Sequence, residues 1–383
     1  MRSYLFTAWI VAGAAAAMLY PAAFLHWGPF DLRGRWPLLI VMQVIMFGMG
    51  TQMSLRDFAG VIRAPRGVMI GIACHFSVMP LTGFGLIHVF HFPAEIAAGV
   101  ILIGSCSSGM SSNVMAYIAR ANLALSVTVT AVTTMIAPIM TPLLMKLLAR
   151  TLIDVSFISM MLEIVKIVII PIGAALLHDY LKHASPWGRR RIFRASVAAA
   201  AALAWLACGG WIWLEGRFSG HLLETFGVFF FALSILPVGA GYHWATGRLP
   251  RLDRLAPVAS MAGAVYFTCV TTAAGRDNLL KVGLLLFAAS AIHNAAGYVF
   301  GYWLARGAGL DRNSSRSVAF EVGMQNAGLA SGLAGAMGKL GTVGMAPAIF
   351  GPWMNVSGSL LANYWRRRPA DGAVGLPQTA PVT

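Results

Sequence analysis

The amino-acid sequence predicts an all-α polytopic membrane protein. Of the 383 residues, 58% are hydrophobic and only 11% are charged, and the mean hydropathy is +0.73. Soluble globular chains carry roughly 25% charged residues, because their surfaces must be solvated. The apolar residues are also gathered in runs of about 20, the helix length that crosses a hydrocarbon core about 30 Å thick. A conventional soluble domain is therefore excluded.

Twelve apolar runs follow one another along the chain, and each is expected to form one membrane-spanning helix. The predicted spans are residues 5–25, 36–54, 67–88, 95–119, 121–145, 155–178, 195–214, 222–245, 255–275, 282–305, 313–338 and 342–365. The first run could be mistaken for a signal peptide, but it is long and is followed by a poor cleavage region. We interpret it as a retained helix.

The distribution of Lys and Arg residues predicts how the chain is oriented across the membrane. With the amino terminus placed inside, 19 Lys and Arg residues fall in inside segments and 8 in outside segments, and Lys166 lies within a span. This asymmetry predicts that both termini are cytoplasmic, in an inner or plasma membrane. The net charge of +15 is thereby explained without a nucleic-acid partner, since the basic residues do not line one face with interleaved aromatic residues.

Two of the predicted spans are interrupted by polar residues. The fourth contains residues 104–113, with five serines, two glycines and an asparagine, and the eleventh contains residues 321–328, with Glu321, Gln325 and Asn326. Lipid cannot satisfy freed backbone groups, so unwound backbone at this depth must be buried in protein or line a wet cavity. Paired broken helices in corresponding places of two halves point to the binding site of a secondary transporter.

The positions of the interruptions also predict the domain organisation. They are the fourth and eleventh of twelve spans, and they become the fourth member of each of two five-helix repeats if one helical pair is inserted in the second half. Five is odd, so the second repeat is inverted. We expect the first repeat and the start of the second at 1–180, the inserted pair and its basic loops at 181–254, the remainder of the second repeat at 255–368, and a disordered cytoplasmic tail at 369–383. The inserted pair is a candidate interface for a homodimer.

Glu321 is the strongest functional candidate, because a carboxylate inside a membrane is costly and usually functional. Glu163 is the other deep carboxylate, but Lys166 lies three residues further on, where the two can pair on one helical face. Glu321 has basic neighbours at helical spacing only toward the cytoplasmic end, and these would extend away from it. A bound cation is its natural counter-charge. The serine run alone has a plainer alternative, close helix packing through small residues.

Several long motifs in order along the chain carry a family resemblance. They are GSCSSGMSSNVMAYIARANLALSVTVTAVTTMIAPIMTP at 104–142, EVGMQNAGL at 321–329, WMNVSGSLLA at 353–362, MFGMG at 46–50 and HNAAGY at 293–298. Together they resemble the bile acid:sodium symporter family over roughly residues 1–180 and 255–368. The resemblance implies a ten-helix inverted-repeat fold with a core domain, a panel domain and two broken helices that cross at mid-membrane. It also implies sodium-coupled symport of an organic anion.

The resemblance further implies two sodium sites built from oxygen ligands, which suit a hard cation. The first would use Ser112, Asn113, Ser126, Thr130 and Glu321. The second would use His75, Glu321, Gln325 and the backbone carbonyls of Val322 and Met324. His75 stands where the family has a glutamine, and a neutral imidazole is a poorer partner for sodium than an amide oxygen. Two sodium ions with a monoanion would move one net charge, whereas loss of the second site would make the transport electroneutral.

The expected substrate pocket departs from the family pattern. The usual Pro-Gly-Gly-Thr of the crossover is here Ser-Ser-Gly-Met, and Met354 replaces a residue that is often histidine. The candidate substrate contacts are Met110, Ser111, Asn326, Met354 and Asn355. Half-helix N-termini at the crossover would favour an anionic group. The cargo is expected to be a bile-acid-like, keto-acid or pantoate-like organic anion.

Other functions fit the sequence less well. The same fold could act as a proton-coupled or uncoupled permease, with Glu321 titrating. A non-transporting sensor and an intramembrane enzyme are further alternatives, but no ordered set of catalytic residues or metal ligands is apparent. The chain has no Walker motif, which argues against ATP-driven transport. Sodium is thus the expected coupling ion, and the expected partners are membrane lipid and a small organic anion.

Overall fold

The computed structural model describes residues 2–368, so the predicted disordered tail at 369–383 lies outside the described residues. Nearly all regular structure in this range is helical. Its strands are β1 (His26–Trp27) and β2 (Phe30–Asp31), which form a small antiparallel hairpin. The helices in chain order are α1 (Arg2–Leu19), α2 (Pro21–Leu25), α3 (Arg35–Gly50), α4 (Gly60–Arg63), α5 (Pro65–Phe90), α6 (Ala94–Ser105), α7 (Ser111–Ile118), α8 (Leu123–Leu148), α9 (Phe157–Ile164), α10 (Ile170–His183), α11 (Pro186–Trp205), α12 (Trp211–Glu215), α13 (His221–Leu233), α14 (Ile235–Arg248), α15 (Arg251–Ala274), α16 (Arg276–Gly307), α17 (Arg312–Gly323), α18 (Ala327–Ala336) and α19 (Met345–Arg366).

Helices lie on every one of the twelve predicted apolar runs. Seven helical stretches in the described residues are long and apolar enough to cross a membrane, or up to eight if the bent pair at Arg35–Gly50 and Leu55–Arg63 is one span. The all-α prediction is confirmed, and the chain is an integral membrane protein. The count of twelve spans and the inverted repeat stay predictions.

The two predicted interruptions are real breaks between helices. Helix α6 ends at Ser105 and helix α17 ends at Gly323, and the residues that follow, Cys106 and Met324, have extended backbone. The two extended segments pair with each other: the Gly109 amide donates to the Met324 carbonyl (2.9 Å), and the Asn326 amide donates to the Ser107 carbonyl (2.8 Å). A Cβ atom on Gly109 would lie 2.6 Å from the Gln325 carbonyl oxygen, so only glycine allows this approach.

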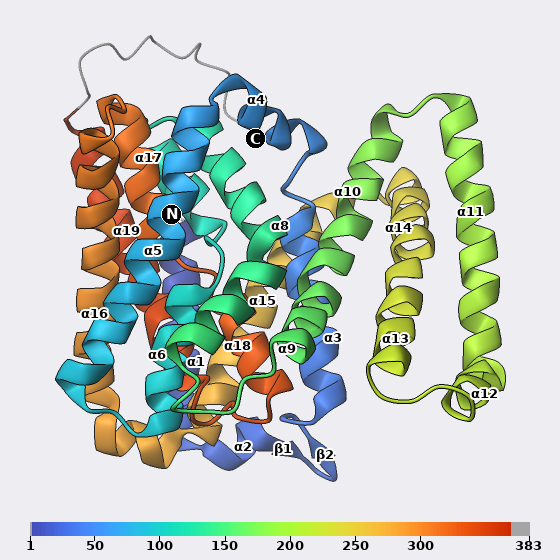
Figure 1. Ribbon diagram of the computed structural model, residues 1–383, viewed down its shortest axis with the longest axis horizontal. Coiled ribbons are helices and arrows are strands. Elements are labelled where there is room, and N and C mark those ends of the chain that lie inside the picture. The colour runs from blue at the N-terminus through green and yellow to red at the C-terminus, as the bar shows by residue number, and fades with distance from the viewer. Residues whose placement is uncertain (1, 369–383) are drawn as a thin grey trace.

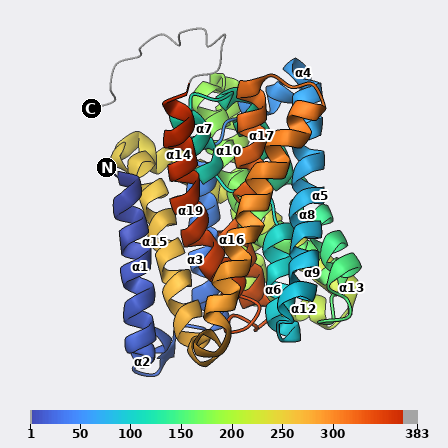
Figure 2. The ribbon, with the colours of Figure 1, turned by 90° about the vertical axis from the view of Figure 1, so that its left-hand side faces the viewer.

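The helices form two groups around this crossing. Helices α5, α6, α7, α8, α16, α17, α18 and α19 pack around the paired breaks, and we call them the crossover bundle. Helices α1, α3, α10 and α15 pack on one another beside it, and we call them the flanking layer. Figure 2 shows α1 and α15 side by side at the edge of the crossover bundle.

The four helices α11 to α14 lie within the predicted insertion at 181–254. Helix α14 packs on α10 of the flanking layer, and α11 packs on α14. Helices α11 to α14 therefore lie at the outer edge of the molecule, away from the paired breaks (Figure 1). Its predicted use as a homodimer interface stays a prediction.

The loops that are rich in Lys and Arg gather at one end of the molecule. The end carrying α4 also holds the start of α17, the end of α19 and the turn between α10 and α11 (Figures 1 and 2). These segments are the ones that the charge distribution assigns to the cytoplasm. Which compartment this end faces stays a prediction.

Candidate functional site

The Glu321 side chain lies in the last turn of α17 and is 0% exposed. Helix α17 begins behind Asp311, whose carboxylate accepts hydrogen bonds from the backbone amides of Asn313 (2.8 Å) and Ser314 (3.0 Å). Burial raises the pKa of the Asp311 carboxyl, but hydrogen bonds from Ser314 and Asn313 outweigh burial and leave the pKa below its usual value. An ionised N-cap of this kind stabilises the start of the helix that carries Glu321.

Three hydroxyl groups surround the Glu321 carboxylate. Its Oε1 atom accepts hydrogen bonds from Ser112 Oγ (2.5 Å) and Ser126 Oγ (2.5 Å), and its Oε2 atom accepts one from Thr130 Oγ1 (2.7 Å). Ser126 and Thr130 are four residues apart and so share one face of α8. Ser112 lies at the start of α7, directly after the break. The carboxylate thus ties α17 to both neighbouring helices.

Asn113 completes the cluster. Its Oδ1 atom accepts hydrogen bonds from Ser126 Oγ (2.8 Å) and Thr130 Oγ1 (3.2 Å), while its Nδ2 atom faces the Met110 sulfur at 3.8 Å. The structure therefore brings together all five residues that were predicted for the first sodium site. We call Ser112, Asn113, Ser126, Thr130 and Glu321 the oxygen cluster.

The oxygen cluster has more acceptors than protons. Each hydroxyl carries one hydrogen, yet each lies within hydrogen-bond distance of two acceptors. Ser126 and Thr130 each reach both Glu321 and Asn113, and Ser112 reaches both Glu321 and the Gly109 carbonyl (2.8 Å). Glu321 makes no ion pair with any residue from 2 to 368. A buried carboxylate with surplus oxygens and no cation of its own fits a hard cation.

The residues predicted for the second sodium site also lie together, but they are bonded to one another. His75 is 0% exposed, and its Nδ1 and Nε2 atoms lie 2.9 Å from the Glu321 carbonyl and 2.8 Å from the Cys106 carbonyl. Gln325 Nε2 donates to the Val322 carbonyl (2.8 Å), and the Met324 carbonyl accepts from the Gly109 amide. Gln325 Oε1 is buried without a hydrogen-bond partner among the described residues.

A cavity of about 260 Å³ adjoins the oxygen cluster. Its walls are mostly apolar and are formed by Gln52, Met53, Met110, Asn113, Val114, Tyr117, Leu123, Val127 and Thr130. Asn113 and Thr130 belong to both the cavity and the oxygen cluster, so a ligand in the cavity would lie beside a cation in the cluster.

The predicted substrate contacts are only partly brought to this cavity. Met110 lines it, and Ser111 follows at the start of α7. Asn326 caps α18, with its Oδ1 atom accepting from the Leu329 amide (2.9 Å). Met354 is buried on α19, and Asn355 donates to the carbonyl one helical turn earlier (2.9 Å). Of the five predicted contacts, Met110 alone belongs to the cavity wall.

Most residues of the cavity wall were not among the predicted substrate contacts. Val114 and Tyr117 could have been found, because they lie four and seven residues after Met110 and share its face of the helix. Gln52 and Met53, which follow α3 in sequence, carry no such signal. They reach the cavity only through the packing of the flanking layer against the crossover bundle.

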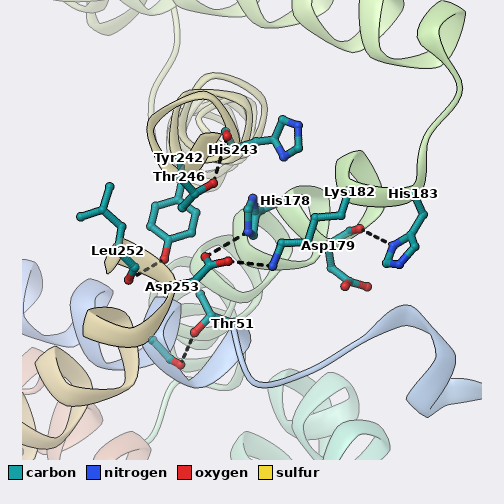
Figure 3. Close-up of polar contacts among 11 residues, drawn as sticks. Thr51, His178, Asp179, Lys182, His183, Tyr242, His243, Thr246, Leu252 and Asp253 are labelled. Atoms are coloured by element: carbon teal, nitrogen blue, oxygen red, sulfur yellow. Dashed lines mark hydrogen bonds and ion pairs between the residues drawn. The ribbon is translucent and has the colours of Figure 1, made fainter. Parts of the chain in front are cut away.

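A second group of charged residues joins α10, α14 and α15 (Figure 3). The Asp253 carboxylate lies 3.2 Å from His178 Nε2 and 2.9 Å from Lys182 Nζ. The rings of Tyr242 and His243 lie 4.9 and 5.4 Å from the His178 ring. We call these five residues the Asp253 cluster. No group of His, Cys, Asp and Glu among residues 2–368 is arranged to hold a metal ion.

The predicted pairing of Glu163 with Lys166 is confirmed, with 2.9 Å between Oε1 and Nζ. Glu163 and Asp253 therefore each have a basic partner from the protein, and Glu321 has only hydroxyl groups. Among these three carboxylates in helical segments, Glu321 is the one whose negative charge the protein leaves unpaired.

Comparisons with known proteins extend these observations. The model of the Sodium Bile acid symporter family matches residues 39–214. The chain is 33% identical to the "Uncharacterized sodium-dependent transporter YocS" of Bacillus subtilis, over 95% of this chain and 91% of that protein. It is 28% identical to the "Probable sodium/metabolite cotransporter BASS1, chloroplastic" of Arabidopsis thaliana, over 94% of this chain and 73% of that protein. It is 27% identical to the human "Ileal sodium/bile acid cotransporter", over 77% of this chain and 67% of that protein.

The fold is also similar to a solved structure, that of the sodium proton antiporter MjNhaP1 from Methanocaldococcus jannaschii. The TM-score is 0.51, and the match covers 96% of this chain and 98% of the antiporter. The sequence identity is 12%, so this likeness concerns the arrangement of helices alone.

Proposed function

The chain belongs to the Sodium Bile acid symporter family, whose members are sodium-coupled transporters and not enzymes, and on this premise we propose that it is a sodium-coupled symporter of an organic anion. The observation that carries the proposal is the Glu321 carboxylate, which is fully buried among hydroxyl oxygens without an ion pair. A sodium ion held by the oxygen cluster supplies the missing positive charge. Sodium is here a transported ion, and the protein releases it on the other side of the membrane.

The coupling follows from residues shared by the ion and the anion. Sodium binding fixes α7, α8 and α17 relative to one another, because the oxygen cluster takes ligands from all three helices. Asn113 and Thr130 also line the cavity, so the bound ion holds that wall in the shape that accepts the anion. By reciprocity the bound anion strengthens sodium binding by the same factor. Alternating access then moves the crossover bundle against the flanking layer around a fixed site.

The cavity supports a small anion with an apolar body. Its walls are mostly apolar side chains, and two of its polar residues, Asn113 and Thr130, lie beside the proposed sodium ion. The adjoining start of α7 presents a helix N-terminus, which favours negative charge. Drug-sized ligands usually occupy pockets of roughly 300–1,000 Å³, so the cavity of about 260 Å³ favours a keto-acid or pantoate-like anion over a steroid conjugate.

The basic end of the molecule is proposed to face the cytoplasm, with both termini on that side of an inner or plasma membrane. The positive-inside rule supports this orientation, because the loops at that end carry most of the Lys and Arg residues.

A sodium titration of uptake tests the proposed function against its alternative, a proton-coupled or uncoupled permease of the same fold. Uptake of a panel of organic anions into vesicles, including keto acids, pantoate-like acids and steroid conjugates, is measured at several sodium concentrations and several pH values. The proposal expects uptake of at least one anion to saturate with sodium at each pH. Uptake that follows pH and is indifferent to sodium contradicts it.

A further inference from the structure

His75 connects the ends of both broken helices. The residue comes from α5, which crosses behind the two breaks, and its ring lies between the Cys106 carbonyl at the end of α6 and the Glu321 carbonyl near the end of α17. Helix C-termini carry unpaired carbonyl groups and a partial negative charge. Two negative helix ends therefore converge on one side chain. This convergence is the kind of place in which a transporter can hold a cation.

The carbonyl groups at the end of α17 all face other groups of the protein. The Glu321 carbonyl faces His75, the Val322 carbonyl accepts from Gln325 Nε2, and the Gly323 carbonyl accepts from Asn294 Nδ2 (2.8 Å). The Met324 carbonyl accepts from the Gly109 backbone amide across the crossing (2.9 Å). The Val322, Gly323 and Met324 carbonyls thus each accept from a protein donor, and the imidazole ring covers the Glu321 carbonyl.

The two predicted ion positions therefore differ in their supply of free oxygens. The oxygen cluster has surplus acceptors, whereas the position at His75 retains Gln325 Oε1 and the one carbonyl, of Cys106 or Glu321, to which a neutral imidazole does not donate. Hard cations take about six oxygen ligands, and two free oxygens do not form such a site. The imidazole ring also fills the space between the two carbonyls whichever nitrogen carries a hydrogen.

We propose that His75 takes the place of a second coupling ion, so that each transport cycle moves one sodium ion. The imidazole ring permanently occupies the position between the ends of α6 and α17 that a bound ion would occupy transiently. Symport of a monoanion is then electroneutral. This inference rests on the proposed function and adds its ion stoichiometry, and it assigns His75 as a positioning residue.

The test is the ratio of radioactive sodium flux to anion flux in proteoliposomes that contain the full chain. We expect a ratio near one in the unchanged protein, a Hill coefficient near one for sodium, and no uptake current with a monoanion. His75→Gln replaces the ring by an amide oxygen and should raise the ratio and the Hill coefficient toward two and produce a current. His293→Gln is the matched control, because His293 is also buried in the crossover bundle but bonds a single carbonyl, that of Met79 (2.7 Å).

Each outcome decides the proposal. A ratio near two in the unchanged protein overturns it, even if His75→Gln fails to fold. An active His75→Gln variant that keeps a ratio of one also overturns it. Uptake that is indifferent to sodium would instead defeat the proposed function, and this inference with it, so the two failures are distinguishable.

Discussion

Two carboxylates in helical segments, Glu321 and Asp253, differ in their burial and in their charged partners. Asp253 has Lys182 and His178 within ion-pair distance, and its side chain is 36% exposed. Glu321 is fully buried, and its carboxylate has only hydroxyl partners. The cost of an unpaired charge rises steeply with burial. A partly exposed carboxylate that is paired with a basic side chain can have a purely structural role. A buried carboxylate without such a partner is instead expected to bind an ion from solution.

The largest expected effect is that of Glu321→Gln. The amide can still bond the surrounding hydroxyl groups, so the protein should fold, but it has no charge to hold sodium. We expect sodium-coupled uptake to fall by about 100-fold or more, a loss of ~2.7 kcal/mol in ion binding. Uptake in vesicles with a sodium gradient measures this. Asp253→Asn is the matched control and should retain coupled uptake. Equal losses of uptake in both variants would show that the two carboxylates do not differ in their role in sodium coupling.

A second large effect should come from filling the cavity beside the oxygen cluster. Val127→Trp adds a bulky ring to a space of about 260 Å³ without changing any cluster residue. We expect anion uptake to fall by about tenfold or more, which corresponds to ~1.4 kcal/mol. Binding of radioactive sodium to the purified protein should persist. A variant that transports normally would show that the anion binds elsewhere.

An intermediate effect is expected when one hydroxyl is removed from the oxygen cluster. Thr130→Val keeps the shape of the side chain but deletes a group that contacts both Glu321 and Asn113. Loss of a hydrogen bond to a charged group costs about 1.5–3 kcal/mol, so the sodium concentration for half-maximal uptake should rise by about tenfold or more. Thr134→Val is the control, because its hydroxyl bonds the Thr130 carbonyl (2.8 Å) and Ser107 Oγ (3.4 Å) and contacts neither Glu321 nor Asn113 in the described structure. An equal shift in the control would assign the effect to packing.

The smallest effect belongs to the Asp253 cluster. Lys182→Ala removes a partner of Asp253, but both side chains are more than a third exposed. Exposed ion pairs contribute about 0–1 kcal/mol, so thermal unfolding should shift by a few degrees at most. The sodium dependence of uptake should not change. A large change in sodium affinity would mean that this cluster, and not only Glu321, participates in coupling.

The helices and the oxygen cluster could be predicted because their signals are local. Apolar runs of fixed length identify the helical segments, and a carboxylate among glycines and amides marks a break. The resemblance then supplied the residues on α7 and α8, and the structure brings those five together. Glu163 and Lys166 were equally accessible to prediction, since they are three residues apart on one helix.

The cavity and the Asp253 cluster could not be predicted, because they depend on contacts between distant segments. Asp253 and Lys182 are 71 residues apart, and no helical spacing relates them. Asn326 and Asn355 were expected to contact substrate as polar residues near the crossing. Asn326 instead accepts from the Leu329 amide and faces the Met49 sulfur, and Asn355 donates within its own helix. Polarity therefore did not predict which side chains face the cavity, and their role in substrate binding stays a prediction.

The most direct measurement of the central claim is equilibrium binding of radioactive sodium to the purified protein, without substrate transport. We predict saturable binding in the unchanged protein, loss of that binding in Glu321→Gln, and its retention in Asp253→Asn. Undiminished sodium binding by Glu321→Gln would contradict the account, because the ion would then be held without the buried carboxylate that has no ion pair among residues 2–368.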